Sequence, residues 1–153
     1  MDTEHFNDPA DARPYYRLLG LQTEAGTAPG HARIRLEGRP ELSNARGDIH
    51  GGVVASLLDA AMGVAVRSAY EEGEGATTVS ITVNYLEPGR GTLVATARVM
   101  RAGQSLASVE AEVVDQSARR VAHGVATMRI IRPAGKPPEV PARSPLSTKG
   151  SKE

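Results

Sequence analysis

The segment that most constrains the fold is "GGVVASLLDAAMGVAVRSAY", from Gly51 to Tyr70. Its composition predicts one helix that ends near the Gly-rich run "EEGEG" (71–75). A surface helix keeps a polar face, and this one keeps none over about three turns. We therefore expect other structure to enclose it. The apolar positions are 53, 54, 57, 58, 60, 61, 62, 64, 65 and 66.

Alternating patterns on both sides of this helix predict strands. "HARIRLE" (31–37) alternates apolar and charged residues, and a Gly- and Pro-containing loop joins it to the helix. Runs at 77–86, 92–100, 105–114 and 120–131 are separated by short turn segments, which is typical of an antiparallel meander.

Two faces of these strands can be read from the alternation. In the run 77–86 it places Val79, Ile81, Val83 and Tyr85 on one face, and Thr78, Ser80, Thr82 and Asn84 on the other. In the run 105–114 it groups Ala107, Val109, Ala111 and Val113.

The fold class expected is α+β: an antiparallel sheet of about five to six strands beside a long central helix. Residues 1–132 form a single domain with a short N-terminal helix at about 9–19, capped by Asp8 with Pro9 in the first turn. The tail 133–153, with five prolines and three lysines, has little to bury, and we expect disorder there. One sheet covers only part of the helix, so we expect a homodimer.

The composition of the 153-residue chain excludes several partners and cofactors. Lys plus Arg and Asp plus Glu are both 18, which argues against binding to nucleic acid or an anionic membrane. Without cysteine there is no disulfide, thiolate nucleophile or Cys-ligated zinc. The N-terminus has no apolar signal region, and the apolar stretch 53–66 is shorter than the ~18 residues of a membrane span. We therefore expect a cytoplasmic protein.

Asp59 is a single carboxylate within this apolar helix. Small residues surround it on the helical wheel, among them Ala55, Ser56 and Gly63, so we expect the carboxylate to be largely desolvated. Such a group usually has a partner, a raised pKa or a chemical role, and a desolvated carboxylate makes a better general base. A bond to neighbouring backbone or to an arginine explains it equally well.

The start of the helix offers donors for an anion. His50, Gly51 and Gly52 stand where the loop becomes helix, and the first N–H groups of a helix lack internal partners. Glycine lets a ligand oxygen approach them, as an oxyanion hole requires. Simple helix entry is the alternative. Asn44, in the loop before it, either donates its amide to a carbonyl or bonds its own loop.

Other chemistries lack their motifs. The four histidines show no i, i+4 pair for zinc, "GEGATT" lacks the ending of a phosphate loop, and no G-x-S-x-G elbow occurs. Arg90 and Arg101, near predicted turns with Arg98, Arg119 and Arg120, either form a solvated rim or bind an anionic ligand's phosphates.

The pattern N-x(5)-H-G-G-x(7)-D at Asn44, His50 and Asp59, followed by "TTVSITVNYLEPGRG" and "VAHGVATMRI", resembles the hotdog-fold acyl-CoA thioesterases. The phenylacetate-degradation branch is the most similar, and the resemblance covers about residues 15–131. It implies a sheet wrapped around the central helix and a dimer with a continuous sheet, often doubled to a tetramer. It also implies hydrolysis of an acyl-CoA to free acid and CoA without metal or prosthetic group.

The resemblance implies a role for each site residue. Asn44 and the Gly51 N–H, with His50 beside it, polarise the thioester carbonyl. Asp59 acts as general base or nucleophile, and Thr78 (or the adjacent Thr77) orients the attacking water. Gly52, Arg90 and Arg101 are candidates for binding the substrate.

Helix geometry adds a constraint. His50 and Asp59 are nine residues apart, which corresponds to about 13 Å at ~1.5 Å per residue. Reacting groups must lie within ~3–3.5 Å of their target atoms. Gly51 and Asp59 of one chain therefore cannot serve one thioester, and we expect a composite site between two copies.

Two other functions are weighed. A non-catalytic acyl-CoA-binding dimer has no need of Asp59 or of the His-Gly-Gly sequence. A hotdog hydratase or dehydratase pairs a catalytic His with a carboxylate in motifs that this sequence lacks. The acyl group, and the choice between dimer and tetramer, stay open at this point.

Overall fold

A computed structural model describes residues 13–25, 27–133 and 135. Helix α2 is the long central element, and six strands form one sheet. The elements are α1 (Pro14–Leu19), β1 (Leu21–Thr23), β2 (His31–Glu37), η3 (Pro40–Leu42), α2 (Gly51–Ser68), β3 (Gly75–Tyr85), β4 (Thr92–Ala102), β5 (Leu106–Asp115) and β6 (Arg120–Ile131).

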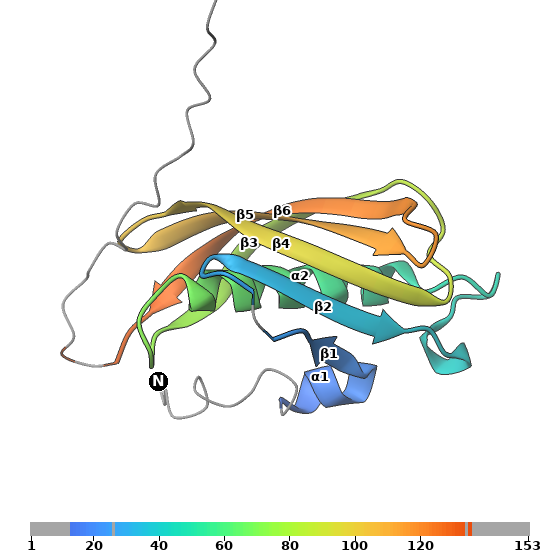
Figure 1. The fold of residues 1–153 in the computed structure, drawn as a ribbon, viewed down its shortest axis with the longest axis horizontal. Helices are drawn as coiled ribbons and strands as arrows, with labels where there is room; N and C mark the ends of the chain where they lie inside the picture. Colours follow the sequence, from blue (N-terminus) through green and yellow to red (C-terminus); the bar gives the residue numbers. More distant parts are fainter. Residues whose placement is uncertain (1–12, 26, 134, 136–153) are drawn as a thin grey trace, which may run out of the picture.

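The sheet has the strand order β1-β2-β4-β5-β6-β3 and is antiparallel throughout. It curves over one side of α2, and α1 lies next to the edge strand β1, on the same side of the sheet as α2 (Figure 1). The predicted α+β class, with an antiparallel sheet around a long central helix, is confirmed. The predicted ranges of α2, β2 and β6 agree closely with the structure.

The predicted simple meander is wrong at one connection. β4, β5 and β6 follow one another in the sheet, but β3 pairs with β6, and β4 pairs with β2 on its other side. The segment "EPGRG" therefore carries the chain across the end of the sheet and is not a hairpin turn. As a result β3 is an edge strand, and its second edge is unpaired among the described residues.

A β-bulge in β3 corrects the predicted faces of that strand. Thr78 pairs with Met128 and Ser80 with Thr127, so Val79 is the extra residue. Met128 is buried among the side chains that face α2, and Thr78 opposite it therefore faces the helix too. Strict alternation had placed Thr78 on the other face. The faces predicted for β5 are confirmed, because Ala107, Val109, Ala111 and Val113 are all buried.

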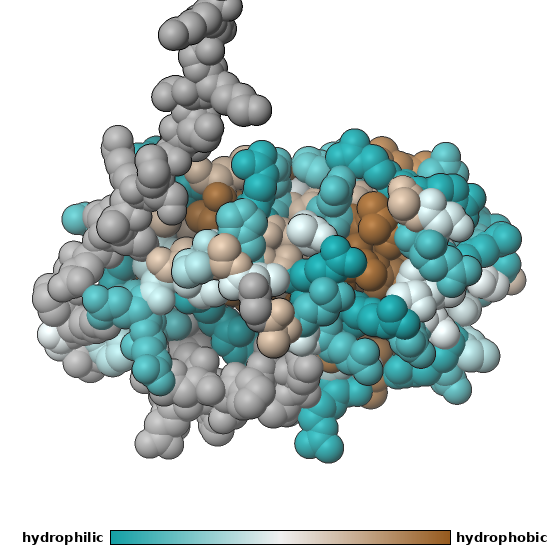
Figure 2. Space-filling view, viewed as in Figure 1, coloured by the Kyte–Doolittle hydropathy of each residue, from teal (hydrophilic) through white to brown (hydrophobic). Residues whose placement is uncertain are grey.

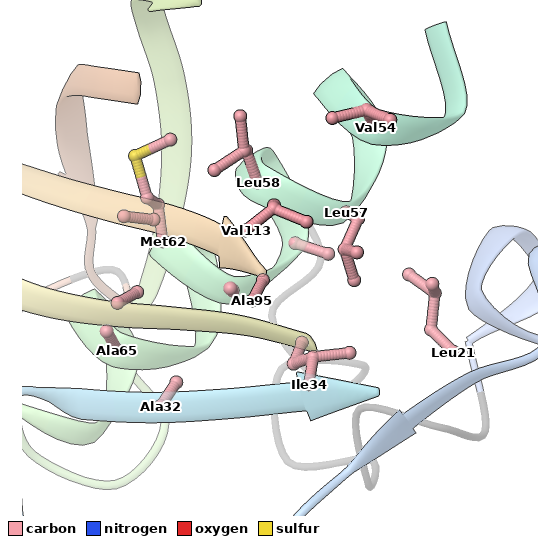
Figure 3. Close-up of a cluster of buried hydrophobic side chains, with 14 of the residues drawn as sticks. Leu21, Ala32, Ile34, Val54, Leu57, Leu58, Met62, Ala65, Ala95 and Val113 are labelled. Carbon is pink, nitrogen blue, oxygen red and sulfur yellow. The ribbon is translucent and has the colours of Figure 1, made fainter. Parts of the chain in front are cut away.

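The core lies between α2 and the sheet. In Figure 3, Leu57 of the helix points toward the strands, and Leu57 and Leu58 belong to one buried cluster with Ile34, Ala95 and Val113. Gly124 of β6 lets the helix approach this strand closely. A Cβ at Gly124 would lie 3.1 Å from the Thr82 carbonyl oxygen and 3.4 Å from side-chain carbons of Leu58 and Met62. The missing side chain thus sets the distance between α2 and β6.

The N-terminal helix differs from its predicted range. It begins at Pro14, which takes the first turn, while Arg13 before it is extended. Pro14 therefore opens the helix and does not lie inside it. The expected cap Asp8 and Pro9 lie outside the described residues, as do residues 136–153 of the tail. The three-residue strand β1 gave no signal in the sequence, because it is too short to show alternation.

The single chain does not enclose α2 completely. Helix α2 has 18 residues with a mean hydropathy of 1.3, so by length and composition alone this helix could cross a membrane. A core helix passes the same criteria, and eight of its residues are buried here. Asp59 and its neighbours Ala55 and Ser56 are only half-buried. On the face seen in Figure 2, hydrophobic residues show as small separate areas between hydrophilic ones.

Candidate active site

Asp59 and Thr78 form a hydrogen-bonded pair between α2 and β3. The Thr78 hydroxyl donates to Asp59 Oδ1 at 2.7 Å. Of the two adjacent threonines, it is therefore Thr78 that contacts Asp59. Thr77 lies opposite the exposed residue Arg129 of β6 in the sheet, so its side chain is on the face away from the helix. Asp59 is half-buried in the single chain, which is less than the strong desolvation expected from the sequence. The carboxylate therefore has a partner, and part of it is open to a ligand.

An open hollow of about 240 Å³ lies beside Asp59. Its walls come from α1, α2 and β3. They are Tyr15, Tyr16, Ala55, Ser56, Asp59, Ala60 and Ile81. The tyrosines were not singled out from the sequence, because nothing in it shows that α1 folds against this part of α2.

The first two N–H groups of α2, those of Gly51 and Gly52, differ in whether they are already bonded. His50 is the N-cap, and its Nδ1 accepts the Gly52 N–H at 3.0 Å. Gly52 was a candidate for substrate binding, but its N–H is already bonded. Among the described residues the Gly51 N–H has no acceptor. Gly51 is thus the one N–H of the pair that can polarise a carbonyl.

Tyr85 of β3 fixes the backbone at this point. Its hydroxyl donates to the Gly51 carbonyl oxygen at 2.8 Å, and its ring lies 3.3 Å from where a Cβ of residue 51 would be. The alternation in the sequence grouped Tyr85 with Ile81 and Val83 on one face of β3, but it contained no signal for this contact. The ring accounts for glycine at position 51.

The side chain of Asn44 organises its own loop. Its Oδ1 accepts the N–H of Arg46 at 2.8 Å and of Asp48 at 3.2 Å. The alternative that Asn44 bonds the backbone of its own loop is therefore confirmed. Its Nδ2 has no acceptor in the part of the chain that the structure describes, so the amide can still donate. Asn44 and Gly51 line a second hollow of about 280 Å³.

One chain does not bring all the predicted catalytic residues together. Asn44, Gly51 and Tyr85 line one hollow, whereas Asp59 lines the other. The two hollows share no lining residue. This separation is what the helix spacing predicts, because Gly51 and Asp59 lie eight residues apart, or about 12 Å along α2.

The two candidate arginines lie far apart. Arg90 Nε donates to Asp48 Oδ1 at 2.6 Å, next to the Asn44 loop. Arg101 lies near the other end of β4, nine residues beyond Thr92, a separation of about 30 Å along the strand. They cannot hold the same phosphate within one chain. Arg98, Arg119 and Arg120 each pair with an acidic residue.

Asp48 is a buried carboxylate that anchors this loop. The hydrogen bond from Arg90 lowers the pKa of Asp48, and the charges of Arg90 and Arg46 lower it further against the opposing effect of burial. Asp48 therefore stays ionised, and its ion pair ties the loop of Asn44 to the start of β4. Across the described residues no group of three or more His, Asp or Glu side chains is placed to hold a metal ion.

Comparison with known proteins agrees with this architecture. The sequence profile of the thioesterase superfamily matches residues 46–122, and the chain belongs to this superfamily. A Halobacterium salinarum protein, named only provisionally as an esterase, is 37% identical over 126 residues, which cover 75% of this chain and 83% of that protein. The medium/long-chain acyl-CoA thioesterase YigI of Salmonella typhimurium is 31% identical over 133 residues, which cover 76% and 85%.

Among solved structures, the Escherichia coli PaaI protein of the phenylacetic acid degradation operon superposes with a TM-score of 0.73. It is 27% identical and the match covers 79% of this chain and 86% of that one. The expected resemblance to hotdog-fold thioesterases of this type is confirmed.

Proposed function

We propose that this protein is an acyl-CoA thioesterase that hydrolyses an acyl-CoA to the free acid and CoA. The observation that carries the proposal is the pair of Asp59 and Thr78, a half-exposed carboxylate bonded to a hydroxyl at the wall of an open hollow. Membership of the thioesterase superfamily supports the reaction class. A cytoplasmic location and the absence of a cofactor are parts of this proposal.

In this mechanism the Gly51 N–H and Asn44 Nδ2 bind the thioester carbonyl oxygen and stabilise the oxyanion. Asp59 takes a proton from a water molecule, whose oxygen attacks the carbonyl carbon. The Thr78 hydroxyl hydrogen is engaged by Asp59, so its oxygen is free to accept from that water. The C–S bond then breaks, and the proton held by Asp59 passes to the departing thiolate. Direct attack by Asp59, followed by hydrolysis of the anhydride, is the alternative route.

The site is proposed to form between two copies of the chain. Within the described part of the chain, one edge of β3 is unpaired, and Val79 and Ile81 of this strand are 60% and 37% exposed. A long apolar edge strand is a template for pairing with another strand. A second copy that pairs there extends the sheet and can bring its Asn44 and Gly51 to Asp59. Pairing of two such dimers to a tetramer is a further expectation from the family resemblance.

The direct test is thiol release from a series of acyl-CoAs by the wild-type protein and by Asp59→Asn. The amide keeps the shape of the carboxylate but cannot act as a base, so we expect turnover to fall about 10²–10⁴-fold. Circular dichroism and the oligomeric state should be unchanged. Thiol release near the wild-type rate from Asp59→Asn would refute the mechanism. Wild-type binding of acyl-CoA without any thiol release would favour a non-catalytic binding protein.

A further inference from the structure

Helix α1 is held against α2 at the level of Asp59 by two tyrosine hydroxyls. Tyr16 OH donates to the Ala60 carbonyl oxygen at 3.3 Å, and Tyr15 OH lies 2.9 Å from Ser56 Oγ. Ser56 already donates its hydroxyl hydrogen to the Gly52 carbonyl oxygen at 2.9 Å. Tyr15 is therefore the donor to Ser56, and both tyrosine hydroxyls are used in attaching α1.

The opposite end of α1 is attached as well. The Arg39 guanidinium donates to the carbonyl oxygens of Leu18 at 2.6 Å and Leu19 at 3.2 Å. At the start of the helix, the guanidinium of Arg13 lies 5.5 Å from the centre of the Tyr16 ring. A six-residue helix has little stability of its own. These contacts explain how it can still act as a fixed wall.

The two rings line the hollow beside Asp59. Because their hydroxyls are bonded to α2, the rings present mainly apolar surface to a ligand. The lining also includes the small residues Ala55 and Ala60 of α2 and the apolar Ile81 of β3. An apolar group that extends from Asp59 into this hollow therefore meets the tyrosine rings.

We propose that Tyr15 and Tyr16 form the end wall of the acyl site and limit the acyl group to an aromatic ring or a medium-length chain. The inference rests on the proposed function, because Asp59 marks the position of the thioester only if it acts on that bond. The acyl group begins at Asp59 and ends at the rings. A longer chain has to displace α1, at the cost of its bonds to Ser56 and Ala60.

The test compares kcat/KM for phenylacetyl-, octanoyl- and hexadecanoyl-CoA in Tyr15→Ala, Tyr15→Phe and Leu18→Ala. Tyr15 is 55% exposed, so its removal should not unfold the protein. Leu18 is the matched control, since it lies on the same helix, is 66% exposed and does not line the hollow. Tyr15→Phe keeps the ring and loses only the hydroxyl.

We expect Tyr15→Ala to raise the ratio of hexadecanoyl-CoA to octanoyl-CoA activity about tenfold or more, the discrimination typical of steric fit in an apolar pocket. Leu18→Ala should keep the wild-type ratio, whereas Tyr15→Phe, which keeps the ring but loses the bond to Ser56, should raise the ratio less than Tyr15→Ala does. An unchanged ratio in Tyr15→Ala, or an equal change in Leu18→Ala, would overturn the end wall.

A binding measurement separates this inference from the proposed function. Lack of thiol release by the wild-type protein with every acyl-CoA would overturn the function. Affinities of non-hydrolysable thioether analogues of the same chain lengths then test the wall alone. Improved binding of the hexadecyl analogue to Tyr15→Ala supports the wall, and the same length dependence as in wild type overturns it.

Discussion

The Thr78 hydroxyl donates a 2.7 Å hydrogen bond to Asp59 Oδ1, and the β-bulge beside Thr78 makes that bond possible. Without the extra residue Val79, Thr78 would point to the outer face of the sheet with Ser80. Bulges often re-aim a side chain next to an active site. The bulge therefore connects the backbone of β3 to the proposed chemistry.

Thr78→Val should lower kcat about tenfold to a hundredfold, since a misplaced carboxylate and water lose that much rate. Valine keeps the branched shape but has no hydroxyl. Thr78→Ser keeps the hydroxyl and should retain most of the activity. Steady-state kinetics with one acyl-CoA measure both variants. Equal kcat values for the valine and serine variants would contradict a role for the hydroxyl.

Asn44→Asp separates the loop function of Asn44 from its donor function. A carboxylate oxygen can still accept the N–H groups of Arg46 and Asp48, but the donating amide is gone. We expect kcat to fall about 10²–10³-fold, as for loss of one oxyanion donor, with the urea midpoint nearly unchanged. Asn44→Ala loses both functions and should also be less stable, by about 1 kcal/mol. Full activity in Asn44→Asp would exclude the amide from the oxyanion hole.

Ile81→Lys should convert the protein to monomers. Lysine on an exposed edge strand opposes strand pairing, and two copies meeting at β3 bring like charges together. Val125→Lys is the matched control, because Val125 is 38% exposed, close to the 37% of Ile81, and lies on an interior strand. Light scattering coupled to size exclusion gives the mass. A dimer that persists in Ile81→Lys would place the interface elsewhere.

The stabilisation that Asp48 provides should be lost in acid. Its folded-state pKa is lowered below the ordinary value of 3.8, first by the hydrogen bond from Arg90. Its stabilisation is thus fully present above 3.8 and is lost as the pH falls through the folded-state pKa. Urea unfolding of wild type and Asp48→Asn from neutral pH to about pH 3 measures this. The difference in free energy of unfolding between wild type and Asp48→Asn should become smaller as the pH falls. A difference that does not change with pH would contradict the ion pair as its source.

Local patterns in the sequence predicted most single elements of the fold. Helix α2 and strand β2 follow from residue periodicity, and the buried face of β5 follows from its alternation. Strand neighbours did not follow, because a short Gly-Pro segment such as "EPGRG" serves a hairpin and a crossing connection equally well. The bulge at Val79 was also hidden, since it depends on pairing with Met128 and Thr127.

For the candidate site, the sequence supplied the residues but not all their contacts. Asp59, Asn44 and Gly51 stood out by residue type and spacing, and the spacing alone separated Gly51 from Asp59. Tyr15, Tyr16 and Tyr85 were missed as site residues, because they reach α2 only through the packing of α1 and β3. Gly52 was wrongly considered a free donor for the substrate, because the sequence does not show that the His50 ring accepts the Gly52 N–H.

The central claim, a site shared by two copies, is tested most directly by co-expressing Asp59→Asn and Asn44→Ala chains with different tags. Each homodimer carries two defective sites, whereas a heterodimer combines one intact Asp59 with one intact Asn44. We predict that a statistical mixture recovers about a quarter of the wild-type thiol release, since half of the dimers then hold one intact site. A mixture no more active than its two parents, despite heterodimers on tandem purification, would contradict the shared site.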